Sequence, residues 1–171
     1  MSHGERYVTG KDRIPDQREK SDLYRQAADA LAAMLEGETE PGIVMSSIVA
    51  VLHHTMPHYF WTGFYRVVGD ELCVGPYQGT PACLRIARGR GVCGKAWLEG
   101  QPVIVEDVQA FPGHIACDAR SASEIVIPWT DAHGRVMAVL DIDSSMPAAF
   151  DECDREHLMY LANLYRISGP L

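Results

Sequence analysis

Residues 124–143 read EIVIPWTDAHGRVMAVLDID and predict a β-hairpin, the feature that decides the fold class of this chain. The runs 124–129 and 135–143 are rich in apolar and β-branched residues, as strands are. Between them, Asp131-Ala132-His133-Gly134 is a typical turn sequence. Two strands joined by so short a turn must pair in an antiparallel sheet.

The second strand of this hairpin carries two acidic residues on one face. Strict alternation divides it into an apolar face, made of Val136, Ala138, Leu140 and Ile142, and a mixed face, made of Met137, Val139, Asp141 and Asp143. Carboxylates rarely belong to a core. Asp141 and Asp143 are therefore either solvated at the end of the strand or directed into a cavity.

The polar segment upstream of the hairpin contains Cys117. His114 lies three residues before this cysteine and Asp118 directly after it. Structural thiols usually sit inside apolar runs, whereas this setting is typical of a reactive cysteine, the alternative being a loop thiol without a function. Cys83 and Cys93 also lie in glycine- and proline-rich surroundings, which predicts loop or loop-edge positions. An attacking thiol with nearby resolving thiols is the minimum equipment for reversible redox chemistry.

Helical periodicity predicts packing helices at both ends of the chain. Residues 1–20 show no periodicity and are expected to form a flexible tail, which leaves 21–171 as the folded domain. We expect a first helix capped by Ser21, a second over 41–56 that starts at Pro41, and a last one capped by Asp151.

The middle of the chain predicts further strands. Residues 59–68, 71–74 and 101–105 have strand composition, a short helix is expected at 95–99, and 75–90 and 106–123 are expected to be loops. In the first of these strands, alternation puts Trp61, Gly63 and Tyr65 on one face. Two aromatic rings flanking a glycine form either a pocket wall or ordinary core.

Composition restricts the class of protein. The chain has 171 residues, 47% apolar and 22% charged, which suits a single domain with a substantial core. The formal charge of −8 argues against nucleic acid and against a membrane surface as partners, because both require clustered basic residues. No apolar run is as long as a membrane span and the polar start lacks a signal-peptide core, so we expect a cytoplasmic protein, in which the five cysteines form no disulfide framework.

Several short motifs occur in an order that resembles one family, the free methionine-(R)-sulfoxide reductases, which are GAF-domain proteins. They are GPYQG (75–79), ACLRI (82–86), GRGVCG (89–94), EDV (106–108), GHIACD (113–118), SEIV (123–126) and LDIDS (140–144). The resemblance implies an α+β fold with a single GAF domain, in which N-terminal and C-terminal helices pack on a six-stranded antiparallel sheet. It extends from about residue 21 to 167.

The resemblance also implies an activity. The family reduces the R sulfoxide of free methionine, without a cofactor, and takes its electrons from thioredoxin. Carried over to this sequence, it makes Cys117 the attacking cysteine and leaves Cys83 and Cys93 available for disulfide formation. It places five residues around the substrate, namely Trp61, Tyr65, Glu124, Asp141 and Asp143. A homodimer is a further expectation from the family.

The chemistry of the residues agrees with that activity. A sulfoxide sulfur is an adequate electrophile only when its oxygen is protonated or strongly hydrogen-bonded, so the site needs an acid, which Asp143 or Glu124 could supply. Crowded carboxylates raise one another's pKa, and those that ionise can bind the substrate ammonium. Trp61 offers an apolar face for the methylsulfinyl group.

Two other functions are compatible with the sequence. A GAF sensor that binds a small molecule without turnover would need the cavity but not three loop cysteines. A zinc site made of Cys83, Cys93, Cys117 and His114 would lack the paired Cys-x-x-Cys spacing typical of such sites. We therefore expect no metal.

Overall fold

The computed structural model describes residues 13–113 and 118–167, which build one antiparallel sheet. Its six strands lie in the order β3-β2-β1-β6-β5-β4. They are β1 (Trp61–Val68), β2 (Glu71–Gln78), β3 (Arg85–Ala87), β4 (Val103–Val105), β5 (Ser123–Thr130) and β6 (Val136–Ser144). The predicted α+β fold with a six-stranded antiparallel sheet is thus confirmed.

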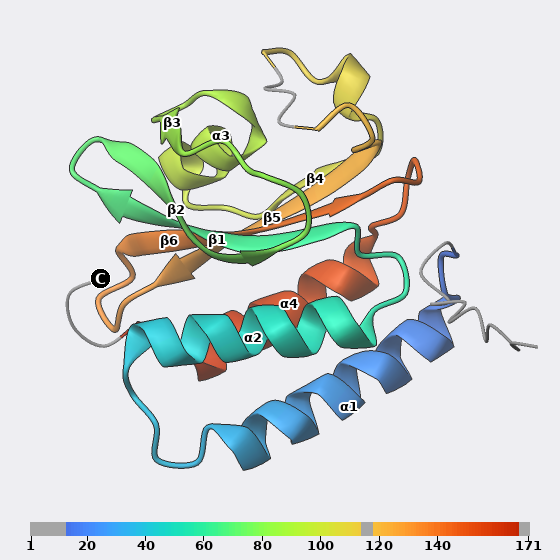
Figure 1. Ribbon diagram of the computed structural model, residues 1–171, viewed down its shortest axis with the longest axis vertical. Coiled ribbons are helices and arrows are strands. Elements are labelled where there is room, and N and C mark those ends of the chain that lie inside the picture. The colour runs from blue at the N-terminus through green and yellow to red at the C-terminus, as the bar shows by residue number, and fades with distance from the viewer. Residues whose placement is uncertain (1–12, 114–117, 168–171) are drawn as a thin grey trace, which may run out of the picture.

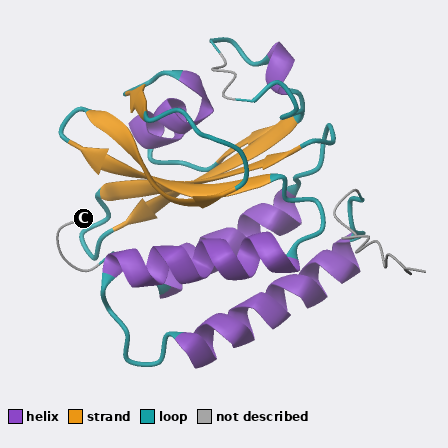
Figure 2. Ribbon diagram, in the orientation of Figure 1, coloured by secondary structure: helices purple, strands orange, loops and turns teal. Residues whose placement is uncertain are grey.

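Helices cover the two faces of the sheet unequally. One face carries α1 (Gln17–Met34), α2 (Pro41–Thr55) and α4 (Glu152–Leu164), whereas α3 (Gly91–Glu99) lies on the other (Figure 1). Figure 2 shows the same layers, with α1 outermost and α2 and α4 between it and the sheet. Within the described parts of the chain, no helix combines the length and the apolar character needed to cross a membrane.

The alternation of β1 separates two apolar clusters. Phe64 points to the helix side, where it packs with residues such as Leu52 of α2 and Trp129 of β5. Trp61 and Tyr65 point to the α3 side, into a smaller cluster. The larger cluster packs the sheet against α1, α2 and α4, and the smaller one lies between the sheet and α3.

The predicted hairpin is present, and the carboxylate of Asp131 organises its turn. Asp131 Oδ1 accepts hydrogen bonds from the backbone N–H groups of His133 and Arg135, at 2.8 and 3.0 Å. The predicted alternation is wrong at the start of β6, because the register shifts from Trp129↔Ala138 to Thr130↔Val136. Met137 therefore packs on the helix side and Val136 on the α3 side, while the prediction holds from Ala138 onward.

The first helix begins earlier than predicted. Asp16, and not Ser21, caps α1 by accepting a hydrogen bond from the backbone N–H of Glu19 at 2.9 Å. The helix therefore includes the last residues of the segment expected to be a flexible tail, and Lys20 is only 1% exposed. The rest of that expectation, over residues 1–12, lies outside the described residues.

Two predictions in the glycine-rich middle of the chain are wrong. The segment 75–90 is not one loop, because β2 continues to Gln78 through an irregularity opposite β1, and β3 follows. The helix predicted at 95–99 begins at Gly91, so Cys93 is helical and buried. A Cβ at Gly94 would lie 2.8 Å from the carbonyl oxygen of Ala87, so this glycine serves close packing of α3 on β3 and does not mark a loop.

Candidate functional site

Strand register brings the predicted acidic and aromatic residues together on the α3 face of the sheet. Asp143 of β6 lies between Trp61 of β1 and Glu124 of β5, and Asp141 lies opposite Gly63. Residues that pair across adjacent strands have their side chains about 5 Å apart on the same face. The pleat of three central strands therefore gathers an indole and three carboxyl groups.

These residues line one pocket between the sheet and α3. Its walls include all five predicted substrate-contacting residues, Trp61, Tyr65, Glu124, Asp141 and Asp143. Cys93 of α3 also contributes, and Thr80, Pro81 and Ala82 from the β2–β3 connection cover one side. The two aspartates of β6 are thus directed into a cavity, which decides between the two alternatives left open by the sequence.

Two of the three carboxyl groups that share this face of the sheet are buried, and that of Asp143 is half-buried. Glu124 is 5% exposed and Asp141 7%, and burial raises the pKa of Asp141 from 3.8 to about 6. Burial, followed by the negative charge of Asp141, also raises the pKa of Glu124 and of Asp143 well above the usual range. The pocket therefore holds carboxyl groups that stay protonated when ordinary ones are ionised.

Two glycines make room for the Trp61 indole. A Cβ at Gly63 would overlap the Trp61 ring, and one at Gly79 would approach it closely. The indole stacks with Tyr65 and with Tyr77, at ring-centroid distances of 6.0 and 5.4 Å, and its Nε1 donates a hydrogen bond to the carbonyl oxygen of Thr80 at 3.0 Å. Trp61 is therefore a fixed apolar wall of the pocket.

Cys93 is a free thiol at the base of the pocket. It lies in the first turn of α3, is 4% exposed, and its Sγ is 3.9 Å from Glu124 Oε1. Burial, together with the nearby charges of Asp141 and Glu124, raises the pKa of the Cys93 thiol well above its usual range. Cys93 is consequently a weak nucleophile in this state.

The other predicted cysteines behave differently. Cys83 is disulfide-bonded and half-buried in the β2–β3 connection, next to the pocket-lining Ala82. Cys117 and His114 lie outside the described residues. Cys73 and Cys153 are free and do not line the pocket; Cys73 lies against Arg85 and Cys153 against Ser21.

Sequence reasoning missed Thr80 and Ser121 as pocket residues, and noted Asp118 only as a neighbour of Cys117. The Thr80 hydroxyl donates to Asp118 Oδ2 at 2.7 Å, and Arg120 forms an ion pair with Asp118 at 2.8 Å. The hydrogen bonds from Arg120 and Thr80 hold the pKa of Asp118 well below its usual range. This contact anchors the segment that follows residue 117 against the pocket wall.

Comparisons with known proteins agree with this architecture. The model of the GAF domain family matches residues 17–167. The chain is 45% identical over 146 residues to protein YtsP of Bacillus subtilis, covering 84% of this chain and 89% of that protein. It is 40% identical over 142 residues to the free methionine-R-sulfoxide reductase of Escherichia coli, covering 83% of this chain and 86% of that enzyme.

A solved structure is similar to this chain in both sequence and fold. The free methionine-R-sulfoxide reductase of Neisseria meningitidis, in complex with its substrate, is 42% identical and superimposes with a TM-score of 0.81. The match covers 90% of each chain. The family match, the identity of these relatives and the shared architecture show that the chain belongs to the GAF domain family.

Proposed function

We propose that this protein reduces free methionine-(R)-sulfoxide to methionine. The observation that carries the proposal is one pocket that combines the Trp61 wall, three carboxyl groups and the neighbouring Cys83 disulfide. Relatives of which this chain covers most of the length carry the same activity in their names. A sulfoxide reductase needs an apolar wall, a proton donor and a redox-active thiol, and each has a candidate here.

In the proposed mechanism the Cys117 thiolate attacks the sulfoxide sulfur while Glu124 or Asp143 protonates the oxygen. The attack forms a bond between the two sulfur atoms. The protonated oxygen then passes from the substrate sulfur to Cys117 Sγ as the sulfur–oxygen and sulfur–sulfur bonds of the intermediate break. Methionine leaves with the electron pair on its sulfur, and Cys117 is oxidised to a sulfenic acid. A second thiol then condenses with the sulfenic acid, which releases water and forms a disulfide. Thioredoxin, a dithiol reductant, exchanges with that disulfide and returns both cysteines to thiols.

We propose Cys83, and not Cys93, as the main resolving cysteine. Cys83 is disulfide-bonded while Cys93 is a free thiol whose pKa burial raises. A thiol reacts through its thiolate, so the environment of Cys93 opposes the exchange step. From the sequence, both Cys83 and Cys93 were candidates for the cysteine that resolves the sulfenic acid, and this proposal selects one of them.

The carboxyl groups account for the choice of a free amino acid as substrate. An ionised Asp141 can bind the ammonium group, whereas the nitrogen of a methionine within a peptide is an uncharged amide. Burying Asp141 without that cation would leave its charge uncompensated. A thioredoxin-linked thiol cycle also supports the expected cytoplasmic location, where thiols are kept reduced.

The test is turnover of free methionine-(R)-sulfoxide with thioredoxin or dithiothreitol as reductant. Cys117→Ser should abolish turnover, and the S epimer and N-acetylmethionine sulfoxide should be poor substrates. Cys73→Ser and Cys153→Ser are matched controls and should remain active. Unchanged turnover by Cys117→Ser would refute this mechanism, and binding of the sulfoxide without turnover by the wild type would favour a ligand sensor.

A further inference from the structure

Two residues of the proposed catalytic pocket, Glu124 and Asp141, also form a cluster with Cys93, which the proposed mechanism does not use. Cys93, Glu124 and Asp141 each direct one potential metal ligand, a sulfur and two carboxylate oxygens, into the same space. All three residues are buried. They come from α3, β5 and β6, so rigid elements position all three.

The separations between these atoms are close to those of a zinc site. The three potential ligand atoms lie within 4.8 Å of one another, and Cys93 Sγ is 3.9 Å from Glu124 Oε1. With Zn–S near 2.3 Å and Zn–O near 2.0 Å, tetrahedral ligands are roughly 3.3 to 3.5 Å apart. Small side-chain rotations would therefore close the site around an ion.

An unpartnered oxygen points independently to a positively charged ligand. Asp141 Oδ1 is buried and has no hydrogen-bond partner among the described residues. Asp141 as a whole is 7% exposed, so solvent offers little compensation. A buried carboxylate oxygen without a partner is costly, and a cation would remove that cost.

The donor atoms that remain when Cys83 is disulfide-bonded determine which metal ions the pocket would favour. Cys83 is disulfide-bonded while Cys93 remains a thiol. The oxidised pocket thus keeps one soft sulfur donor beside two hard oxygen donors. Mixed sulfur and oxygen ligands suit Zn²⁺ and its transition-metal neighbours and do not suit Mg²⁺ or Ca²⁺.

We propose that the pocket binds a divalent transition-metal ion such as Zn²⁺ through Cys93, Glu124 and Asp141 while Cys83 is disulfide-bonded. This site differs from the zinc site considered from the sequence, with which it shares only Cys93. Binding releases the ligand protons to solvent and leaves the fourth coordination position toward the pocket. If the proposed function holds, the ion occupies the place of the substrate ammonium and competes with the sulfoxide.

Cobalt provides the direct test, because a thiolate bound to Co²⁺ gives a charge-transfer absorption in the near ultraviolet. The full-length protein, kept oxidised and stripped with a chelator, is titrated with Co²⁺. We expect the band to saturate at one ion per chain and to disappear on addition of Zn²⁺, which binds more tightly. Cys93→Ser should lose the band, whereas Cys73→Ser and Cys153→Ser should keep it.

The acidic ligands are tested by isosteric variants. Asp141→Asn and Glu124→Gln should retain the band but weaken Co²⁺ binding about tenfold or more, since each removes one charged ligand. If a thermal melt shows that Cys93→Ser is unfolded, these two acidic variants still test whether the pocket binds the ion. Absence of a band in the wild type, its survival in Cys93→Ser, or unchanged affinity in both acidic variants would overturn the proposal. The cobalt band is measured without turnover, so failure of the metal-binding proposal can be distinguished from failure of the proposed reductase function.

Discussion

Glu124 of β5 and Asp143 of β6 lie directly opposite each other, and Asp141 lies two residues along β6 on the same face. The pKa of Asp141 is raised to about 6, and its negative charge contributes to the higher pKa of both neighbours. Asp141 is therefore the first of the three to ionise. This arrangement suits two separate roles: Asp141 binds the substrate ammonium, while Glu124 or Asp143 remains protonated and acts as the acid.

Replacing Asp141 by asparagine should change both substrate binding and the pH profile. The variant loses the charge that binds the ammonium, so KM for the free sulfoxide should rise at least tenfold. It also loses a charge that raises the pKa of Glu124 and Asp143. Because the general acid must be protonated, the alkaline limb of kcat should move to lower pH.

The measurement is kcat and KM for free methionine-(R)-sulfoxide between pH 5 and 9, with the wild type in parallel. Asp131→Asn is a matched control, since Asp131 serves the hairpin turn and not the pocket. An alkaline limb that stays in place or moves to higher pH would contradict these two roles.

The same residue predicts how stability depends on pH. Folding raises the pKa of Asp141 from 3.8 to about 6, so the folded state favours its neutral form. That contribution is fully present below about pH 3.8 and is lost as pH rises through about 6. At about 1.4 kcal/mol per pKa unit, the loss amounts to roughly 3 kcal/mol.

Asp141→Asn should therefore gain stability relative to the wild type as pH rises from 4 to 7.5. Urea unfolding of both proteins at the two pH values measures the change, and any fixed packing cost of the amide cancels in the comparison. The gain should approach about 3 kcal/mol, because the asparagine does not ionise. A difference between the two proteins that does not change with pH would show that Asp141 titrates normally.

Gly63→Ala should disturb the pocket through Trp61. An added methyl group would overlap the Trp61 ring and the Cβ of Tyr77, so the indole must move from its position. Overpacking of this kind costs about 1–3 kcal/mol. We expect a lower Tm and a higher KM, because Trp61 is the proposed apolar wall. Gly42→Ala in α2 is the control: its methyl group would press on the Glu40 carboxylate that caps α2, so any loss of stability arises far from the pocket and KM should not change. An unchanged KM in Gly63→Ala would exclude Trp61 from the binding site.

The parts of the fold that depend on local signals could be predicted from the sequence. Pro41 at the start of α2, the Asp151 cap of α4 and the turn before Gly134 act within a few residues. Alternation along β6 likewise placed Asp141 and Asp143 on one face. The sequence could not show whether that face met solvent or a cavity, because α3 decides this by packing against the sheet.

The errors arose where local composition and tertiary packing disagree. Glycines around Cys93 indicated a loop, yet Gly94 is there because the carbonyl oxygen of Ala87 leaves no room for a Cβ. The contact between Thr80 and Asp118 joins segments 38 residues apart, and neither residue signals the other in the sequence. Such contacts become visible only when the register of the sheet is known.

The hydrogen bond from Thr80 to Asp118 should matter for activity. The Thr80 carbonyl holds Trp61 and its hydroxyl holds Asp118, the residue next to the proposed nucleophile Cys117. Thr80→Val keeps the carbonyl and the shape but loses the hydroxyl, so kcat/KM should fall about tenfold through misplacement of the reacting group. Thr80→Ser should restore activity, and Thr39→Val at an exposed position is the control. Equal losses in the serine and valine variants would rule out the hydroxyl as the cause.

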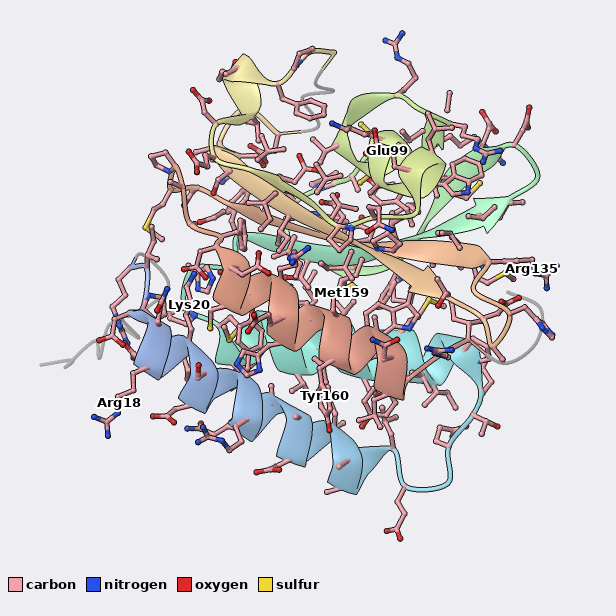
Figure 3. All side chains as sticks on the ribbon, turned by 180° about the vertical axis from the view of Figure 1, so that it is seen from behind. Arg18, Lys20, Glu99, Arg135, Met159 and Tyr160 are labelled. Atoms are coloured by element: carbon pink, nitrogen blue, oxygen red, sulfur yellow. The ribbon has the colours of Figure 1, made fainter. Side chains whose placement is uncertain are left out.

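A buried ion pair connects the first and last helices, far from the pocket. Lys20 is 1% exposed and contacts the carboxylate of Asp154, which is fully buried. Lys20 Nζ also donates to the carbonyl oxygen of Ala149 at 2.9 Å, and the Tyr24 hydroxyl donates to Asp154 at 2.8 Å. Figure 3 shows Lys20 directed toward α4 while Arg18 points outward. The sequence could not indicate this burial, because it depends on a partner 134 residues away.

Lys20→Met should destabilise the fold strongly while leaving the pocket intact. Methionine fills a similar volume but removes the Lys20 cation from the buried Asp154 carboxylate, which then keeps only His58 Nε2, 3.4 Å away, as a basic neighbour. Breaking a buried ion pair in this way costs about 3–5 kcal/mol. Urea unfolding of the variant measures the loss, and Arg18→Met on the exposed side of the same helix should change stability by less than about 0.5 kcal/mol. KM measured on the folded fraction should equal that of the wild type, because the pair lies on the helix side of the sheet. A small loss of stability in Lys20→Met would mean that His58 or water compensates the Asp154 charge once the lysine is gone.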